Sequence, residues 1–423
     1  MAASDRKKIH VYVHPANVME PVRMGTLGAS MIRGSEIFSF DYDPGFLKSD
    51  AVFEIDPDLR LFSGSQYPRE NQRNFGIFLD SSPDRWGRVL MDRYEALKAR
   101  MEQRAPRRLL ESDYLLGVHD DTRMGALRFK TDSNGPFLDN HPDQTVPPMT
   151  SLRALEQAVH AIENDTDLSD HQFSEQLKLL LAPGSSLGGA RPKASVISEK
   201  GHLWIAKFPS RNDRFDSGAW EHLLYQLAVM CHIDMADSTA DRFYSDQTTF
   251  LTKRFDRDDM NRRNHFFSAM TLLGYVDGAG HQSGVSYLEL AELIISRGSN
   301  VNGDLEQLWR RIVFNILAAN TDDHLRNHGF MLKETGLVLS PAYDLNPNPA
   351  GSGLHLNIDE HDNRLETEIA RSVAEYFRLS SSKSSEIIRE MKKVVSTWLS
   401  FARKNRISNH EIELMAPAFN TDR

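Results

Sequence analysis

One apolar stripe that ends in a polar loop constrains the fold of this chain more than any other feature. Asp304 can cap a helix that continues to Leu317, because the apolar residues between them recur at offsets of three and four. The helix should stop near Asn320, since Asn320-Thr-Asp-Asp favours caps and turns over helix interiors. Two short apolar runs then flank Lys333-Glu-Thr-Gly and predict a β-hairpin. The sequence therefore predicts a buried helix followed by a polar loop and then a hairpin, after which comes a second acidic residue, Asp344.

The carboxylates and the amide of this stretch have the spacing of a phosphotransferase loop. Asn327 follows Asp322 by five residues, and Asp344 lies just beyond the second predicted strand. In kinases the first Asp orients the attacking hydroxyl and accepts its proton, while the Asn and the later Asp hold Mg²⁺. The same residues are also consistent with a polar turn in which Asp322 and Asn327 are ordinary caps, because short motifs recur by chance.

Length and composition limit the classes of protein. With 423 residues the chain is long enough for two or three domains. Its net charge of −9 indicates that the whole protein is not built to bind nucleic acid by itself. A single cysteine, Cys231, excludes an intramolecular disulfide framework. Neither a secretion signal nor an apolar run long enough to span a bilayer is apparent, so we expect a soluble, cytoplasmic protein.

The predicted secondary structure differs between the parts of the chain. Short strands are expected within 9–42, and a helix begins after Ser82-Pro-Asp, in which Ser82 is the expected cap. A segment rich in proline, glycine and acids at 131–149 marks the main boundary. From about residue 258 the pattern is mostly helical, with the serine run 380–385 as a loop. The expected domains are 1–145, 146–257 and 258–423.

A glycine-rich turn precedes two predicted strands. Gly184, Gly188 and Gly189 let the backbone approach a ligand closely, and N–H groups there can cradle phosphate, although a flexible hairpin tip accounts for the same glycines. A strand follows at 194–197, and the next one ends near Lys207. A glycine loop, a strand and then a strand lysine is the order found in the ATP-binding lobe of kinases.

Several motifs occur along the chain in one order. They are Asp80-Ser-Ser-Pro-Asp-Arg-Trp-Gly, Ser186-Leu-Gly-Gly-Ala-Arg-Pro-Lys, Lys207, Lys253-Arg-Phe-Asp-Arg, Asn320-Thr-Asp-x-His-x-x-Asn and Tyr343-Asp. Together they resemble the HipA family, the kinase toxins of bacterial HipBA toxin–antitoxin modules, over nearly the whole chain. The resemblance implies an α+β, protein-kinase-like fold of two lobes, one β-rich and nucleotide-binding and one helical, preceded by an N-terminal mixed α/β subdomain.

The resemblance also implies residue roles. Asp322 resembles the catalytic base, and Asn327 and Asp344 resemble the Mg²⁺ ligands. The residues that would contact ATP are Gly188, Gly189, Ala190, Arg191, Lys193, Lys207, Lys253, Arg254, Phe255, His324 and Tyr343. Ser186, or the nearby Ser185, falls where the family autophosphorylates, and a phosphate there can repel the phosphates of the nucleotide.

The implied function is that of an Mg-ATP-dependent serine/threonine protein kinase, the toxin of a bacterial type II system associated with persistence. An aminoacyl-tRNA synthetase would match the family as its substrate. A HipB-like helix-turn-helix antitoxin is the implied partner, through which operator DNA is mainly contacted. Two alternatives stay open: a small-molecule phosphotransferase of the aminoglycoside or choline kinase type, and a non-catalytic HipA-like binding module. Zinc ligation by His324 and His328 fits less well than Mg²⁺, because it requires a helix where a loop is expected.

Overall fold

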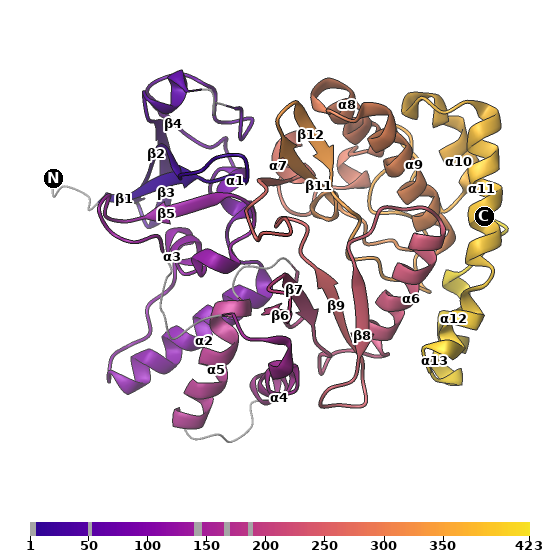
Figure 1. Ribbon diagram of the computed structural model, residues 1–423, viewed down its shortest axis with the longest axis horizontal. Helices are drawn as coiled ribbons and strands as arrows, with labels where there is room; N and C mark the ends of the chain where they lie inside the picture. Colours follow the sequence, from indigo (N-terminus) through magenta and orange to yellow (C-terminus); the bar gives the residue numbers. More distant parts are fainter. Residues whose placement is uncertain (1–5, 50–52, 139–145, 165–169, 185–188) are drawn as a thin grey trace. The chain divides into compact units, whose positions relative to one another are not determined.

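The computed structural model describes residues 6–49, 53–138, 146–164, 170–184 and 189–423 (Figure 1). The chain divides into two compact units, and each is considered by itself. Unit 1 comprises Met1–Asn212, Phe243–Ser245 and Asp256–Phe267, and unit 2 comprises Asp213–Arg242, Asp246–Phe255 and Ser268–Arg423. The three domains expected from the sequence stay a prediction. Among the described residues, each helix is too short or too polar to cross a membrane.

Unit 1 begins with a five-stranded sheet. Its strands are β1 (Lys7–Val13), β2 (Val22–Ile32), β3 (Ser35–Tyr42), β4 (Ser65–Gln66) and β5 (Leu127–Lys130), in the spatial order β4-β3-β2-β1-β5. The neighbouring strands pair antiparallel. Phe40, Phe78 and Phe129 are buried and make ring contacts with one another in sequence, so aromatic packing supports one face of the sheet. The strands expected within residues 9–42 are confirmed.

The rest of unit 1 is mostly helical. Its helices are α1 (Gly76–Asp80), α2 (Arg85–Met101), α3 (Glu111–Leu116), α4 (Leu152–Glu163) and α5 (Asp170–Gly184), and β6 (Lys193–Ile197) pairs antiparallel with β7 (Leu203–Lys207). The cap expected at Ser82 is wrong. Asp84 caps α2, because its carboxylate accepts the Arg85 N–H at 2.8 Å, whereas the Ser82 hydroxyl donates to the Phe78 carbonyl at 2.7 Å.

A segment from the middle of the sequence is part of unit 1. Residues 256–267 follow the second strand of unit 2, yet their side chains bond to the N-terminal part of the chain. The Asp256 carboxylate accepts the Gly125 N–H at 2.9 Å, and the Arg257 guanidinium donates to the Arg123 carbonyl at 2.8 Å. The expected boundary near residue 258 therefore lies inside a segment that unit 1 holds by buried polar contacts.

Arg123 is the most deeply buried cation of this region. Its side chain is 0% exposed and its guanidinium lies 4.6 Å from the Phe129 ring centroid. The guanidinium donates, at 2.8 to 3.3 Å, to the carbonyl oxygens of Ser81, Leu115, Val118 and Leu138. Four backbone acceptors from separate segments are thus satisfied by one side chain, which fixes the path of the chain around it.

We expect Arg123→Met to lower the free energy of unfolding by more than about 3 kcal/mol, because several buried carbonyls lose their donor at once. Chemical denaturation of the full chain measures this loss. Arg108→Met is the matched control, since Arg108 is exposed, and it should change the free energy of unfolding little. Equal stability of the two variants would contradict the assigned role of Arg123.

His265 gives unit 1 a dependence on pH. Complete burial lowers the pKa of its imidazole to about 3, and its Nδ1 accepts the Ala126 N–H at 3.3 Å. The unfolded chain takes up a proton at this histidine below about pH 6.5, whereas the folded chain does not until about pH 3. The contribution of His265 to stability is therefore full above pH 6.5 and is lost as the pH falls.

Between pH 7 and pH 5 the wild type should lose about 2 kcal/mol more of its unfolding free energy than His265→Phe does. Denaturant titrations at the two pH values provide the comparison. His361→Phe serves as a control, because the His361 side chain is 90% exposed, and it should retain the dependence of the wild type. A His265→Phe variant as acid-sensitive as the wild type would contradict the assignment.

Unit 2 is predominantly helical. Its helices are α6 (Ser217–Met230), α7 (Ala269–Leu273), α8 (Tyr287–Arg297), α9 (Val301–Leu317), α10 (Thr367–Ser372), α11 (Ser381–Val395), α12 (Trp398–Lys404) and α13 (Asn409–Met415). Its two antiparallel hairpins are β8 (Ser238–Asp241) with β9 (Thr249–Lys253), and β11 (Gly329–Lys333) with β12 (Gly336–Leu339). A short strand, β10 (Phe266–Ser268), crosses from unit 1 into unit 2.

Helix α9 forms the centre of unit 2. It packs against α8, α10 and α11, and its predicted apolar stripe is buried throughout. The expected cap at Asp304 is wrong: the helix starts at Val301, and the Asp304 carboxylate accepts the Leu339 N–H from β12 at 2.9 Å instead. The hairpin expected after the helix is confirmed as β11 and β12. Helix, loop and hairpin therefore follow one another as the sequence predicts.

The serine run 380–385 was expected as a loop, and this expectation is wrong. Helix α11 begins at Ser381, and the Ser380 hydroxyl accepts the Lys383 N–H at 3.2 Å as its N-cap. Serine is unfavourable within helices but favoured at this position. The buried residues Ile387 and Met391 further along provide the apolar face that stabilises the helix.

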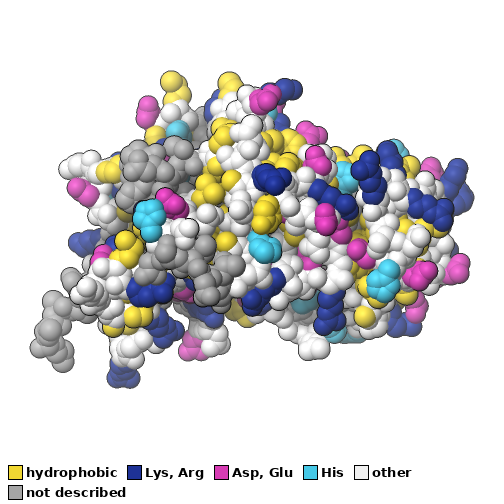
Figure 2. Space-filling model, turned by 90° about the horizontal axis from the view of Figure 1, so that it is seen from below, with side chains coloured by type: hydrophobic (Ala, Val, Ile, Leu, Met, Phe, Trp, Pro, Cys, Tyr) yellow, Lys and Arg dark blue, Asp and Glu magenta, His cyan; other side chains and the backbone are white. Residues whose placement is uncertain are grey.

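On the face of the molecule in Figure 2, the described acidic and basic side chains are intermixed.

Candidate active site

The Asp322 loop, residues 320–328, connects α9 to β11 in unit 2. The chain leaves the helix through Ala319, whose φ of +44° lies in the left-handed region. Asp322 is exposed, and its carbonyl oxygen accepts the His324 N–H and the Asn327 Nδ2–H, both at 3.0 Å. Because the amide nitrogen of Asn327 is used in this way, its amide oxygen is the atom that can bind a cation. The loop thus combines one solvent-facing carboxylate with one oriented amide.

Asp344 is tied to the same loop. Its φ of +60° lies in the left-handed region, which Asp adopts more readily than most residues and which is often found at functional sites. The hydroxyl of the preceding Tyr343 donates to the Arg326 carbonyl at 2.7 Å, next to Asn327. The Asn346 Nδ2–H approaches the Asp344 carboxylate at 3.4 Å. Tyr343 therefore holds the Asp344 segment against the part of the loop that carries Asn327.

Two of the residues expected at the nucleotide base also come together. The Phe255 and Tyr343 rings have their centroids 5.5 Å apart, and Phe255 lies two residues beyond the end of β9. The His324 ring lies edge-on against His355, with centroids 5.8 Å apart. Lys253 ends β9, where its N–H donates to the Asp237 carbonyl at 2.8 Å, and Arg254 is buried. Unit 2 therefore places the ring of Phe255 beside Tyr343, the residue that precedes Asp344.

The expected phosphate-binding residues lie in unit 1. Lys193 and Lys207 are direct partners in the β6–β7 register and are 5% and 9% exposed. Directly opposite residues of an antiparallel pair point to the same face, so two buried ammonium groups share one side of the hairpin. Gly189 has a φ of +93°, and a Cβ there would lie 2.5 Å from Lys193 Nζ. Gly189 and the two lysines therefore lie close together at this end of the hairpin.

The other residues expected in the glycine loop differ in their exposure and contacts, and some lie outside the described residues. Ala190 is exposed, and the Arg191 guanidinium donates to the Phe208 carbonyl at 3.2 Å. Gly188 and the expected autophosphorylation residues, Ser186 and Ser185, lie outside the described residues. Unit 1 thus brings Gly189, Lys193 and Lys207 together.

The first turn of α2 contacts the glycine loop, which the sequence did not indicate. The Asp84 carboxylate accepts the Gly189 N–H, and the Trp86 indole donates to the Lys193 carbonyl at 3.1 Å. The Trp86 N–H also donates to the Gly189 carbonyl at 3.4 Å. Both residues belong to the motif that begins at Asp80, but a contact across about a hundred residues leaves no local pattern in a single sequence.

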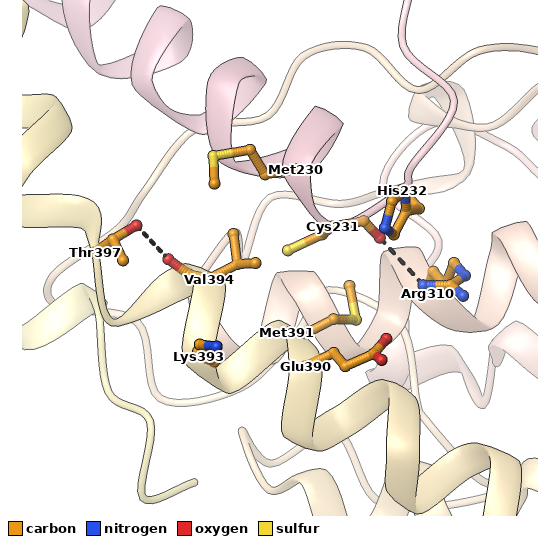
Figure 3. Close-up of a pocket in the computed structure, with 9 residues that line it drawn as sticks. All are labelled: Met230, Cys231, His232, Arg310, Glu390, Met391, Lys393, Val394 and Thr397. Atoms are coloured by element: carbon orange, nitrogen blue, oxygen red, sulfur yellow. Dashed lines mark hydrogen bonds between the residues drawn. The ribbon is translucent and has the colours of Figure 1, made fainter.

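A cavity of about 330 Å³ in unit 2 contains none of the expected site residues (Figure 3). Met230, Met391 and Val394 give it an apolar lining, and Arg310 donates to the Cys231 carbonyl at 3.2 Å. Burial raises the pKa of the Cys231 thiol to about 12, so the thiol stays protonated and is a poor nucleophile. The cavity is therefore not part of the candidate active site.

The chain has an α+β, protein-kinase-like fold, and comparison with known proteins identifies its family. The profile of the HipA-like C-terminal domain matches residues 185–398, which is half of the chain. This protein therefore belongs to the HipA family.

Three relatives and solved structures illustrate the similarity. A protein of Haemophilus influenzae named "Putative kinase" is 27% identical over 194 residues, 41% of this chain and 56% of that protein, so the match spans just over half the length of this relative. The HipA, HipB and operator DNA complex of the Shewanella oneidensis toxin–antitoxin system contains a chain with a TM-score of 0.64 and 17% identity, covering 98% of this chain and 95% of that chain. The Helicobacter pylori proinflammatory kinase CtkA has a TM-score of 0.36 and 13% identity over 55% of this chain and 92% of its own.

Gly189→Ala should weaken ATP binding about tenfold, because a Cβ both disfavours the positive φ and displaces the Lys193 ammonium. Isothermal titration with Mg-ATP measures the dissociation constant. Gly278→Ala is the matched control: its φ is +90°, but no atom lies within 4 Å of the added Cβ. Equal ATP affinity of the two variants would remove Gly189 from the site.

Proposed function

We propose that this protein is an Mg-ATP-dependent serine/threonine protein kinase that acts as the toxin of a bacterial type II toxin–antitoxin system. The observation that supports this best is the arrangement of the Asp322 loop. An exposed carboxylate at Asp322, an oriented amide at Asn327 and a second carboxylate at Asp344 are carried by segments that bond directly to one another. These are the groups that phosphoryl transfer requires.

In the proposed reaction each group has one task. Asp322 takes the proton of a serine or threonine hydroxyl, whose oxygen forms a bond to the γ-phosphorus while the bond from that phosphorus to the bridging oxygen breaks and ADP leaves. Asn327 and Asp344 would hold Mg²⁺, which neutralises charge on the phosphates when bound. Lys193 and Lys207 would bind phosphate oxygens, with Gly189 allowing their close approach, while Phe255, Tyr343 and His324 would lie beside the nucleotide.

The regulation and the partners are part of the same proposal. A phosphate on Ser186 or Ser185 would add negative charge to the glycine loop and oppose the binding of nucleotide phosphates. A HipB-like antitoxin is proposed as the partner through which operator DNA is contacted, since the similar Shewanella oneidensis chain was solved with HipB and operator DNA. The substrate would be a cellular protein, and an aminoacyl-tRNA synthetase is the class that the family resemblance implies.

Incubation with γ-labelled ATP and Mg²⁺, followed by phosphosite mapping, tests this function. We expect label on Ser186 or Ser185 and on a bacterial protein, and a loss of at least about 100-fold in Asp322→Asn, because general-base catalysis typically contributes that much. Asp246→Asn is the matched control, since Asp246 is exposed in unit 2, and it should label as the wild type does. Normal nucleotide binding with no labelled protein would favour a small-molecule kinase or a non-catalytic binding module instead.

A further inference from the structure

We propose that Asp323 is a positioning residue: the buried side chains of His328, Asp323, Asn315 and Asn320 form a relay that sets the position of Asp322 and Asn327 relative to Asp344. The inference rests on the proposed function in one respect, because it states how that site is held in its reactive geometry. It concerns residues other than the proposed catalytic base and the proposed Mg²⁺ ligands. We call these four side chains the Asp323 relay.

The Asp323 relay is centred on one carboxylate oxygen. Asp323 Oδ2 accepts hydrogen bonds from the Tyr287 hydroxyl at 2.6 Å, Asn315 Nδ2 at 2.7 Å and His328 Nε2 at 2.9 Å. The Asp323 side chain is only 4% exposed. Three donors converging on one oxygen favour a full negative charge, because a neutral carbonyl oxygen has two lone pairs. Burial raises the pKa of Asp323, but His328 and Tyr287 outweigh burial and the pKa lies below its ordinary value.

The relay continues from Asp323 toward the Asp344 segment. Asn315 uses its amide nitrogen on Asp323 and accepts Asn320 Nδ2–H on its oxygen at 2.9 Å. The Asn320 oxygen in turn accepts the Asn346 N–H at 3.0 Å. Asn315 and Asn320 are each 1% exposed. Each amide thus donates on one side and accepts on the other, so the direction of every bond follows from the charge on Asp323.

The relay and the residue it bonds, Asn346, lie close in sequence to the three proposed catalytic groups. Asp323 directly follows Asp322, His328 directly follows Asn327, and Asn346 lies two residues beyond Asp344. Asp322 itself is exposed, whereas Asp323, the next residue, is buried and held by three donors. The donors Tyr287 and Asn315 belong to α8 and α9, which pack against each other. The relay therefore connects the loop that carries the exposed Asp322 carboxylate to the packed helices α8 and α9.

A displacement of catalytic groups by about 1 Å can reduce turnover about 100-fold without abolishing substrate binding. The relay should therefore control kcat more than the KM for ATP, because most residues proposed to contact ATP, among them Lys193, Lys207 and Phe255, lie on other segments. A role confined to folding would instead lower the fraction of active protein and leave both constants of the folded fraction unchanged. Expressing kcat per folded enzyme, with the folded fraction measured separately by circular dichroism, therefore separates positioning from stability.

The first test is a kinetic comparison of the full chain with Asp323→Asn, which keeps the shape of the side chain and removes its charge. We expect kcat to fall roughly 10- to 100-fold and the KM for ATP to change less than about threefold. Tyr287→Phe removes one of three donors and should produce a smaller fall in kcat. Asp246→Asn, an exposed aspartate in the same unit, should match the wild type. Wild-type kcat in Asp323→Asn would overturn the proposal.

Hydrogen exchange followed by mass spectrometry provides a test that needs no activity. In Asp323→Asn, peptides covering residues 318–330 and 341–348 should exchange at least several times faster, while peptides from the centre of α9 keep their protection. Unchanged exchange in both loop peptides would overturn the proposal. If Asp323→Asn does not fold, Tyr287→Phe is judged by the same two measurements. Absence of phosphotransfer by the wild type would contradict the proposed function. The exchange result would still decide whether the relay positions the loop.

Discussion

A charge removed from water is stable only where donors replace the water, and this requirement at Asp323 organises the centre of unit 2. Its donors come from α8, α9 and the end of the Asp322 loop, so the carboxylate joins three segments. Arg311 lies on the same helix as Asn315. Burial lowers the pKa of its guanidinium to about 10, and the charge of Asp323 acts against that shift. Beside its apolar stripe, helix α9 also buries the polar side chains of Asp304, Arg310, Arg311 and Asn315.

Unit 1 follows the same principle with the opposite charge. The buried guanidinium of Arg123 binds carbonyl oxygens from separate segments, and Arg257 reaches the Arg123 carbonyl from a part of the chain more than a hundred residues later. The glycine loop is likewise held from a distance, by Asp84 and Trp86 at the start of α2. In both units the groups proposed to bind the nucleotide or transfer phosphate are placed by buried polar contacts rather than by apolar packing alone.

Periodicity and cap chemistry predicted most elements, and their errors have local causes. The apolar stripe of α9 and the β11–β12 hairpin are confirmed because burial of a continuous apolar face outweighs other preferences. The caps at Ser82 and Asp304 were misplaced because each side chain has another partner, the Phe78 carbonyl and the Leu339 N–H respectively. The serine run became the start of α11, since Ser380 is a suitable cap for the buried face that follows.

From the sequence alone, the order of short motifs resembles the HipA family, and this resemblance implied the α+β, kinase-like fold, while local periodicity predicted the individual helices and strands. The sequence also named Asp322, Asn327 and Asp344 as candidates, whose spacing along the chain carries the information. Only the tertiary structure decided what holds them. The contacts of Asp323 with Tyr287, and of Asp84 with Gly189, join residues far apart in sequence. A single amino-acid sequence does not reveal which distant donor bonds to which buried acceptor.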